Sequence, residues 1–265
     1  ILIFGPVPFP ALGVAAAAIA TVLGQWTGKT FGFFLKRRHR RFPLSLRGFR
    51  PRGDILAELC RIGITAAAMQ SLSSVMTLGL NKIMALFDPS AVFILGAYFK
   101  LQSFLIMPVA GLTNGLTPLV AYNYGARSRT RILALTRFAL ALGAAIMAVG
   151  TILLILLPGP LLGLFGAEEN VLSSGIPALR WIAFGLIFSG LSTVLCAVFQ
   201  ALGASMTSLA ISLLRQVVLI LPAAYLLGLV QPQLMWLSFP LAEVLSCLTA
   251  LFLFRHSWRK RLSDL

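Results

Sequence analysis

Long apolar runs, separated by short polar or Gly/Pro-rich segments, dominate the pattern of the chain. Runs of about 20 apolar residues are typical of helices that cross a bilayer, and Gly, Pro and clustered charges mark their connections. The pattern predicts seven spans, at about residues 9–35, 55–86, 91–124, 131–157, 174–201, 207–229 and 234–254. The expected fold class is all-α: a polytopic membrane protein with one helix followed by a six-helix bundle.

Composition supports a membrane protein. Of the 265 residues, 58% are hydrophobic and 11% are charged, whereas about a quarter of the residues of soluble domains are charged. A soluble single domain is therefore excluded. Cys60, Cys196 and Cys247 lie in apolar runs without a CxxC pair, so we expect packed thiols rather than disulfides or metal ligands.

The net charge of +15 is unevenly distributed along the chain. With the predicted spans, the cations of residues 36–52, 127–131 and 255–261 share one side of the membrane, and Asp88, Glu168 and Glu169 lie on the other. The positive-inside bias then places residues 1–8 outside and the C-terminus in the cytoplasm. The expected location is the cell inner (plasma) membrane, as a multi-pass protein.

The basic run KRRHRRFPLSLRGFRPR, residues 36–52, has two interpretations. It could be a nucleic-acid patch, but spans flank it and it has no interleaved aromatic residues other than Phe42 and Phe49, so contact with phospholipid and a role in topology are favoured. No nucleic-acid partner is expected. Because the chain opens with Ile1 and without a charged leader, we expect it to be part of a longer protein.

Two predicted spans carry polar side chains at intervals of three or four residues, which places them on one stripe of each helix. They are Gln70, Ser73, Ser74, Thr77 and Asn81 in the first, and Ser189, Ser192, Thr193, Cys196 and Gln200 in the second. Such a stripe faces protein or water. The hydroxyl groups fit interhelical hydrogen bonding and cavity lining equally well, whereas Gln70 and Asn81 favour a cavity.

The span 91–124 is the most interrupted of the seven. It contains Ser103, Pro108, Gly111, Asn114, Gly115, Thr117 and Pro118. Each proline leaves one helix carbonyl without its usual donor, which a membrane protein tolerates only against other protein or in a wet cavity. Both a binding-site helix of the transporter kind and a purely structural kink fit this pattern.

Ionisable residues inside spans are candidates for function because burying charge in a bilayer is unfavourable. Lys100 lies roughly 14 Å into its span at 1.5 Å per residue, and we expect it to face inward. Glu243, about ten residues into the last span, either carries a coupling proton or is a fixed partner of Lys100 or of a backbone donor. The remaining cations lie near span ends or within a few turns of them, so snorkelling to the interface explains most of the set Lys82, Arg137, Arg180 and Arg215.

Catalytic and metal-binding motifs are missing from the sequence. The two histidines, His39 and His256, lie in basic segments, and there is no GxSxG motif, P-loop or Cys/His cluster. We therefore expect no enzymatic activity and no metal or organic cofactor.

Several segments resemble the multidrug and toxic compound extrusion (MATE) family. They are GPVPFPALGVAAAAIATVLGQ, RIGITAAAMQSLSSVMTLGLNKIM, YFKLQSFLIMPVAGLTNGLTPLVAYNYGAR and FQALG. Family members have twelve helices in two six-helix lobes, so the resemblance implies that the chain is the later part of such a protein. Residues 1–36 would be the last helix of the first lobe, 37–53 a basic cytoplasmic linker, and 54–265 the second lobe.

The resemblance implies secondary antiport: export of drugs or other organic cations in exchange for protons or sodium ions. Sodium-coupled branches have an acidic residue in the seventh helix, where this chain has Ser73, so that site looks absent. The resulting lumen candidates are Gln70, Ser73, Thr77, Asn81, Lys100, Ser103, Asn114, Ser192, Cys196 and Gln200, with Glu243 as the candidate for the coupling ion. Two alternatives stay open: a lipid-linked oligosaccharide or polysaccharide flippase of the same superfamily, and a non-transporting membrane scaffold.

Overall fold

The computed structural model describes residues 13–38 and 52–261. The chain divides into two units, residues 1–56 and 57–265. Within the first unit, α1 is a single helix, Gly13–Arg38. Residues 39–51 of the predicted linker 37–53, with most of its basic run, and the start of the first predicted span lie outside the described residues.

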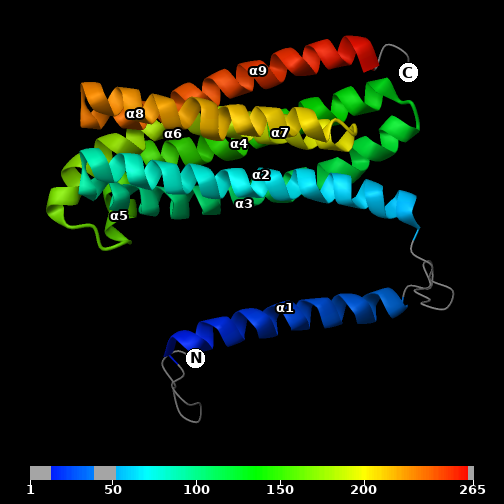
Figure 1. The fold of residues 1–265 in the computed structure, drawn as a ribbon, viewed down its shortest axis with the longest axis horizontal. Helices are drawn as coiled ribbons and strands as arrows, with labels where there is room; N and C mark the ends of the chain where they lie inside the picture. The colour runs from blue at the N-terminus through cyan, green and yellow to red at the C-terminus, as the bar shows by residue number, and fades with distance from the viewer. Residues whose placement is uncertain (1–12, 39–51, 262–265) are drawn as a thin grey trace. The chain divides into compact units, whose positions relative to one another are not determined.

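From α2 onward, whose first residues precede the boundary between the units, the described chain is built from helices alone (Figure 1). In chain order they are α2 (Gly53–Phe87), α3 (Pro89–Gly125), α4 (Arg129–Leu156), α5 (Pro158–Gly163), α6 (Glu169–Ala201), α7 (Ser205–Leu213), η1 (Leu214–Leu219), α8 (Ile220–Val230), η2 (Pro232–Leu237) and α9 (Ser238–Arg261). Segments α7, η1 and α8 follow one another without a break, so they form one long helix with a wider turn in its middle.

The local sequence explains why α3 begins and α6 ends where they do. Asp88 caps α3, because its carboxylate accepts hydrogen bonds from the backbone N–H and the hydroxyl of Ser90 at 2.9 and 2.7 Å, and Pro89 fits the first helical position. At the end of α6, Gly203 adopts φ +73° and the Ala204 N–H bonds to the Phe199 carbonyl at 2.8 Å. This left-handed glycine ends α6 and lets α7 turn back.

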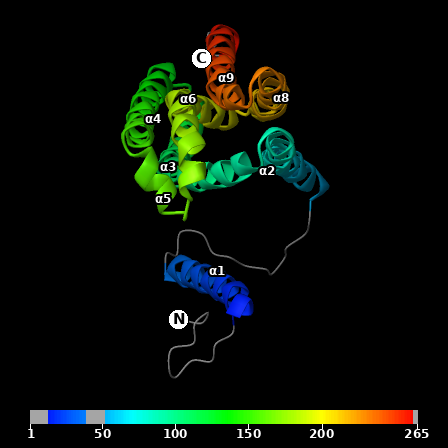
Figure 2. The same ribbon diagram turned by 90° about the vertical axis from the view of Figure 1, so that its left-hand side faces the viewer.

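Helix α6 is the centre of the bundle, and it packs against α3, α4 and α9 (Figure 2). Small residues allow the close approach. A Cβ on Gly190 of α6 would lie 2.6 Å from Met147 Cγ and 3.3 Å from the Gly143 carbonyl oxygen, both on α4. A Cβ on Gly185 would lie 3.0 Å from Pro240 Cα on α9.

Hydroxyl groups reinforce these packed interfaces. Thr151 of α4 donates to the Ala183 carbonyl of α6 at 3.2 Å, as well as to its own helix at Met147. Ser208 of α7 donates to the Cys196 carbonyl of α6 at 2.7 Å. Both hydroxyls are buried, so these serines and threonines satisfy their hydrogen-bonding capacity by linking helices.

Five helices of the described chain are long and apolar enough to cross a membrane: Pro89–Gly125, Arg129–Leu156, Val171–Ala201, Ser205–Val230 and Pro232–His256. They correspond to the last five predicted spans, and the polytopic all-α class is confirmed. Helices α1 and α2 cover the first two predicted spans but fall outside this set. The short α5 and η2 were not predicted. Helix α3 contains Pro108 and Pro118 and remains one helix, so the binding-site helix and the structural kink both stay predictions.

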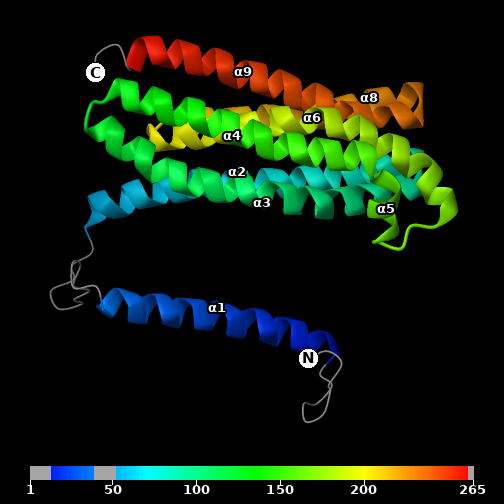
Figure 3. The same cartoon turned by 180° about the vertical axis from the view of Figure 1, so that it is seen from behind.

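Charge is segregated between the two ends of the bundle. The α3–α4 turn and the C-terminal end of α9 lie at one end, which we call the basic end (Figures 1 and 3). Arg127, Arg129 and Arg255 belong to these segments. The opposite end carries Asp88 at the α2–α3 turn and Glu168 at the start of α6.

Candidate functional site

A widened turn in the helix α7–η1–α8 positions two polar side chains inside the bundle. In η1, residues 214–219 form a π-helical turn, and the Ile220 N–H bonds back five residues to the Arg215 carbonyl. Such turns add a residue to the helical repeat and occur frequently at functional sites. Here the turn carries Arg215 and Gln216, and Gln216 is buried.

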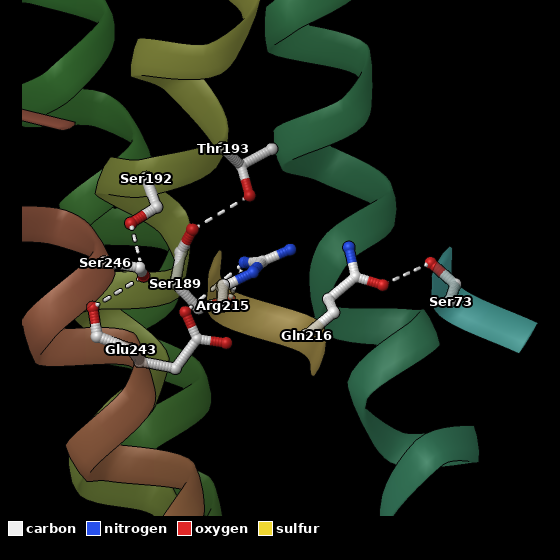
Figure 4. A network of polar contacts seen from close by, with 8 residues as sticks. All are labelled: Ser73, Ser189, Ser192, Thr193, Arg215, Gln216, Glu243 and Ser246. Atoms are coloured by element: carbon white, nitrogen blue, oxygen red, sulfur yellow. Dashed lines mark hydrogen bonds and ion pairs between the residues drawn. The ribbon is translucent and has the colours of Figure 1, made fainter. Parts of the chain in front are cut away.

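Arg215 forms an ion pair with Glu243 of α9 at mid-bundle (Figure 4). The distance from Arg215 Nη1 to Glu243 Oε2 is 3.3 Å, and the two side chains are 22% and 9% exposed. The same Nη1 donates to the Ser189 hydroxyl of α6 at 3.5 Å. Desolvating two charges is unfavourable, and removing one partner of such a pair leaves the other uncompensated. The pair is therefore an energetically costly feature placed inside a membrane helix bundle.

Further hydrogen bonds extend this network across four helices (Figure 4). Ser73 of α2 donates to Gln216 Oε1 at 2.9 Å, which links α2 to the π-helical turn. On the other side, the Ser192 and Ser246 hydroxyls lie 3.4 Å apart, and Ser246 donates to the Glu243 carbonyl at 3.1 Å. These contacts hold the backbone beside Glu243.

Arg215 lines two cavities. The hydroxyl cavity, of about 230 Å³, is lined by Thr113, Asn114, Thr117, Ser192, Thr193, Cys196, Ala197, Gln200, Ile211, Ser212 and Arg215. The carboxylate cavity, of about 140 Å³, is lined by Ser73, Met76, Phe99, Gln102, Ile106, Ser189, Arg215, Gln216, Ile220, Phe239 and Glu243. Arg215 thus contributes a cation to both spaces, and Glu243 an anion to one.

The structure gathers some of the predicted lumen residues and not others. Asn114, Ser192, Cys196 and Gln200 line the hydroxyl cavity, and Ser73 lines the carboxylate cavity with Glu243. The residues that line neither cavity are Gln70, Thr77, Asn81, Lys100 and Ser103. Among them, Thr77 and Ser103 donate their hydroxyls to carbonyls of their own helices, at 2.9 and 2.7 Å.

Two predictions about charged residues are wrong. Arg215 was expected to snorkel to the interface, but it points into the bundle and pairs with Glu243. Lys100 was one expected partner of Glu243, whereas Arg215 takes that place and Lys100 is exposed on α3. The depth of Arg215 in its helix indicates an interior position, because the residue lies about ten residues, or roughly 15 Å, from the start of α7.

Gln216, Ser212 and Thr113 were also missed, although each lines a cavity. The adjacent polar residues Arg215 and Gln216 in an otherwise apolar segment could have indicated Gln216 from the sequence.

Neither cavity resembles a metal site, and no group of three or more His, Cys, Asp or Glu side chains that could hold a metal occurs among the residues with described positions.

Solute transporters are membrane helix bundles with polar and charged side chains between their helices, and this bundle has the same features. The MatE family model matches residues 65–226, more than half of the chain, so the chain belongs to the MatE family. This match includes α3, α6 and the helix that carries Arg215.

Named relatives agree with the family but extend well beyond this chain. Multidrug export protein MepA of Staphylococcus saprophyticus is 27% identical over 221 residues, covering 83% of this chain and 48% of that protein. An FAD transporter of Shewanella oneidensis is 29% identical over 238 residues, covering 85% and 50%. The chain therefore spans about half the length of the curated relatives it matches.

The fold is also shared with solved structures. A MATE protein in complex with MaL6 superimposes with a TM-score of 0.88 at 20% identity, covering 99% of this chain and 60% of that one. The backbone arrangement of the family is thus retained at low sequence identity.

Proposed function

We propose that this chain is the second-lobe part of a secondary antiporter that exports drugs or other organic cations in exchange for protons or sodium ions. The observation that carries the proposal is the Arg215–Glu243 pair inside the bundle, next to two polar cavities. Intramembrane charges of this kind mark substrate and ion pathways. The multidrug export protein among the relatives agrees with this class of substrate.

Glu243 is the proposed binding group for the coupling ion. The resemblance to sodium-coupled branches leads one to expect a carboxylate on the helix that here is α2, at the position of Ser73. Ser73 and Glu243 line the same cavity, although they come from α2 and α9. Glu243 can therefore supply from α9 the carboxylate that α2 lacks.

Competition for Glu243 would couple the two transported species. A proton would neutralise the carboxylate and a sodium ion would screen it, and either event weakens the attraction to Arg215. An organic cation in the carboxylate cavity would compete for the same carboxylate. Because Glu243 can pair with only one of the ion, the substrate and Arg215 at a time, binding of ion and substrate together is unfavourable. Antiport requires this exclusion.

The orientation in the membrane follows from the basic end. Arg127, Arg129 and Arg255 cluster there, so we propose that this end, with the C-terminus, faces the cytoplasm of the inner membrane. A first lobe of the same protein would complete the lumen, because alternating access needs two bundles that move against each other.

An anionic substrate is the second candidate. Arg215 lines both cavities while Glu243 lines only one, so the hydroxyl cavity has a cation without an acid among its lining residues. The relative from Shewanella oneidensis is an FAD transporter, and FAD carries a diphosphate that a guanidinium group can bind. Because both FAD and a lipid-linked sugar carry a diphosphate, the cation alone does not separate them, and the FAD transporter among the relatives favours the nucleotide-like substrate.

Ion flux into proteoliposomes tests the proposal. The full-length protein is reconstituted, an organic cation such as ethidium is supplied on one side, and proton and sodium fluxes are recorded with fluorescent indicators. Antiport predicts ion movement that depends on the cation. Flux that depends only on FAD supports the second candidate, and no flux with any substrate supports the scaffold.

Exposure of Lys100 to a water-filled lumen is a separate prediction. Lys100, Ser103 and Asn114 lie on one exposed stripe of α3, and Asn114 reaches the hydroxyl cavity. In full-length protein without native cysteines, Lys100→Cys should react with a water-soluble thiol reagent. Val149→Cys, on the exposed face of α4, should not react because we expect lipid there. Protection of Lys100→Cys in every state removes this residue from the lumen.

A further inference from the structure

A third cavity lies away from the polar network, between the first turns of α4 and the last turns of α9. Its volume is about 670 Å³, within the usual range for ligand sites. We call it the α4–α9 groove. Its apolar lining includes Leu133, Leu140, Leu251 and Phe254, and its rim carries Arg137, Arg255 and His256.

The central helix α6 closes the floor of the groove. Both α4 and α9 pack against α6 (Figures 2 and 3). The Phe254 ring lies 6.2 Å from the Phe199 ring of α6, centroid to centroid, and Leu140 and Leu251 pack against the same buried cluster. The opposite side is open, because Arg137, Arg255 and His256 are all exposed. The groove therefore opens outward from the bundle, on the side where a bilayer would surround it.

Charge on the rim is positive and uncompensated within the groove. No acidic residue lines it, and neither arginine side chain has an ion pair or hydrogen bond with any residue in the described segments. Arg137 lies about eight residues, or roughly 12 Å, from the start of α4. A guanidinium at that depth needs an anionic partner or a path to water.

We propose that the α4–α9 groove binds one anionic phospholipid, such as phosphatidylglycerol, from the leaflet at the basic end. The phosphate lies between Arg137, Arg255 and His256, and one acyl chain lies along Leu133, Leu140 and Phe254. A guanidinium group matches phosphate oxygens with paired hydrogen bonds, and basic pockets between spanning helices are suited to anionic head groups. The site is separate from the Arg215–Glu243 network and does not depend on the transported substrate.

The test uses purified full-length protein, native mass spectrometry and vesicle-derived phosphatidylglycerol or phosphatidylcholine. The variant Arg137→Gln/Arg255→Gln should lose roughly thirtyfold in affinity for phosphatidylglycerol, because two cations next to the phosphate disappear. Arg127→Gln/Arg131→Gln removes the same charge from the same end but outside the groove, and should bind like the unmodified protein. Phosphatidylcholine binding should be weak in all three.

A second variant tests the acyl-chain part. Leu133→Trp fills the apolar part and keeps both arginines, so it should also weaken phosphatidylglycerol binding, while thermal unfolding shows that the variant remains folded. Equal loss in both arginine variants would overturn the proposal, because binding would then follow total charge. Undiminished binding in Leu133→Trp, or displacement by inorganic phosphate alone, would overturn it as a lipid site. Cross-linking of Phe252→Cys to another protein segment would identify a protein occupant and also overturn it.

Discussion

Replacing Glu243 by glutamine is expected to abolish ion-driven efflux by the full-length protein. Glutamine has nearly the same shape but cannot bind a proton or sodium ion as a carboxylate does. It also leaves Arg215 without its counter-ion, and breaking a buried pair destabilises by about 3–5 kcal/mol. Efflux is measured in vesicles under an imposed pH or sodium gradient, and stability by thermal unfolding in detergent.

A double variant separates coupling from folding. Arg215→Gln/Glu243→Gln replaces the ion pair by two neutral amides, so it should regain much of the lost stability while ion-driven efflux stays absent. Glu168→Gln, at the exposed start of α6, should keep both efflux and stability. Full efflux in Glu243→Gln, or recovery of coupling in the double variant, would reduce Glu243 to a structural acid.

A side chain at Gly185 is expected to disrupt the contact between α6 and α9 and to destabilise the protein. A Cβ there would lie 3.0 Å from Pro240 Cα, 3.3 Å from Pro240 N and 3.5 Å from Glu243 Cγ. Because the first two atoms belong to the backbone, α9 must move to accommodate a side chain. Overpacking of this kind destabilises by about 1–3 kcal/mol, and Gly185→Val should lie at or above the upper end.

Thermal unfolding and substrate efflux of the full-length protein measure this effect. Gly185→Val should lower the unfolding temperature and impair efflux, because the same shift displaces Glu243 from Arg215. Gly96→Val on α3 is the matched control, since a Cβ at Gly96 has no neighbour within 4 Å. An unfolding temperature for Gly185→Val equal to that of the control would mean that α6 and α9 do not pack as closely as described.

Helix positions were predictable because bilayer crossing imposes a length and an apolar composition on each segment. The apolar runs at 131–157 and 234–254 correspond closely to the membrane-crossing helices Arg129–Leu156 and Pro232–His256. The short α5 was not predictable in the same way, since six residues carry too little periodicity. The prolines Pro108 and Pro118 did not reveal that α3 is assigned as one helix, because a helix within a bundle continues through proline where neighbours support it.

The site was only partly predictable, because a stripe on one helix does not reveal which neighbour it faces. Ser73 and Thr77 share a stripe, yet Ser73 bonds to Gln216 across helices while Thr77 bonds within its own helix. The partner of Glu243 depends on how far Arg215 lies from its helix end and on the π-helical turn around it. Neither feature follows from apolar periodicity, whereas counting residues from the helix start would have placed Arg215 at mid-depth.

Thiol accessibility of Cys196 tests most directly whether the interior of this bundle is a water-filled pathway. Cys196 lines the hydroxyl cavity, whereas Cys247 is buried. Two variants of the full-length protein, each retaining one of these cysteines, are treated in membranes with a charged thiol reagent and analysed by mass spectrometry. The account predicts modification of Cys196, slowed by transported substrate, and none of Cys247. If Cys196 stays unmodified in every condition, the account is contradicted, because the cavity would then be a closed space between packed helices that water does not reach.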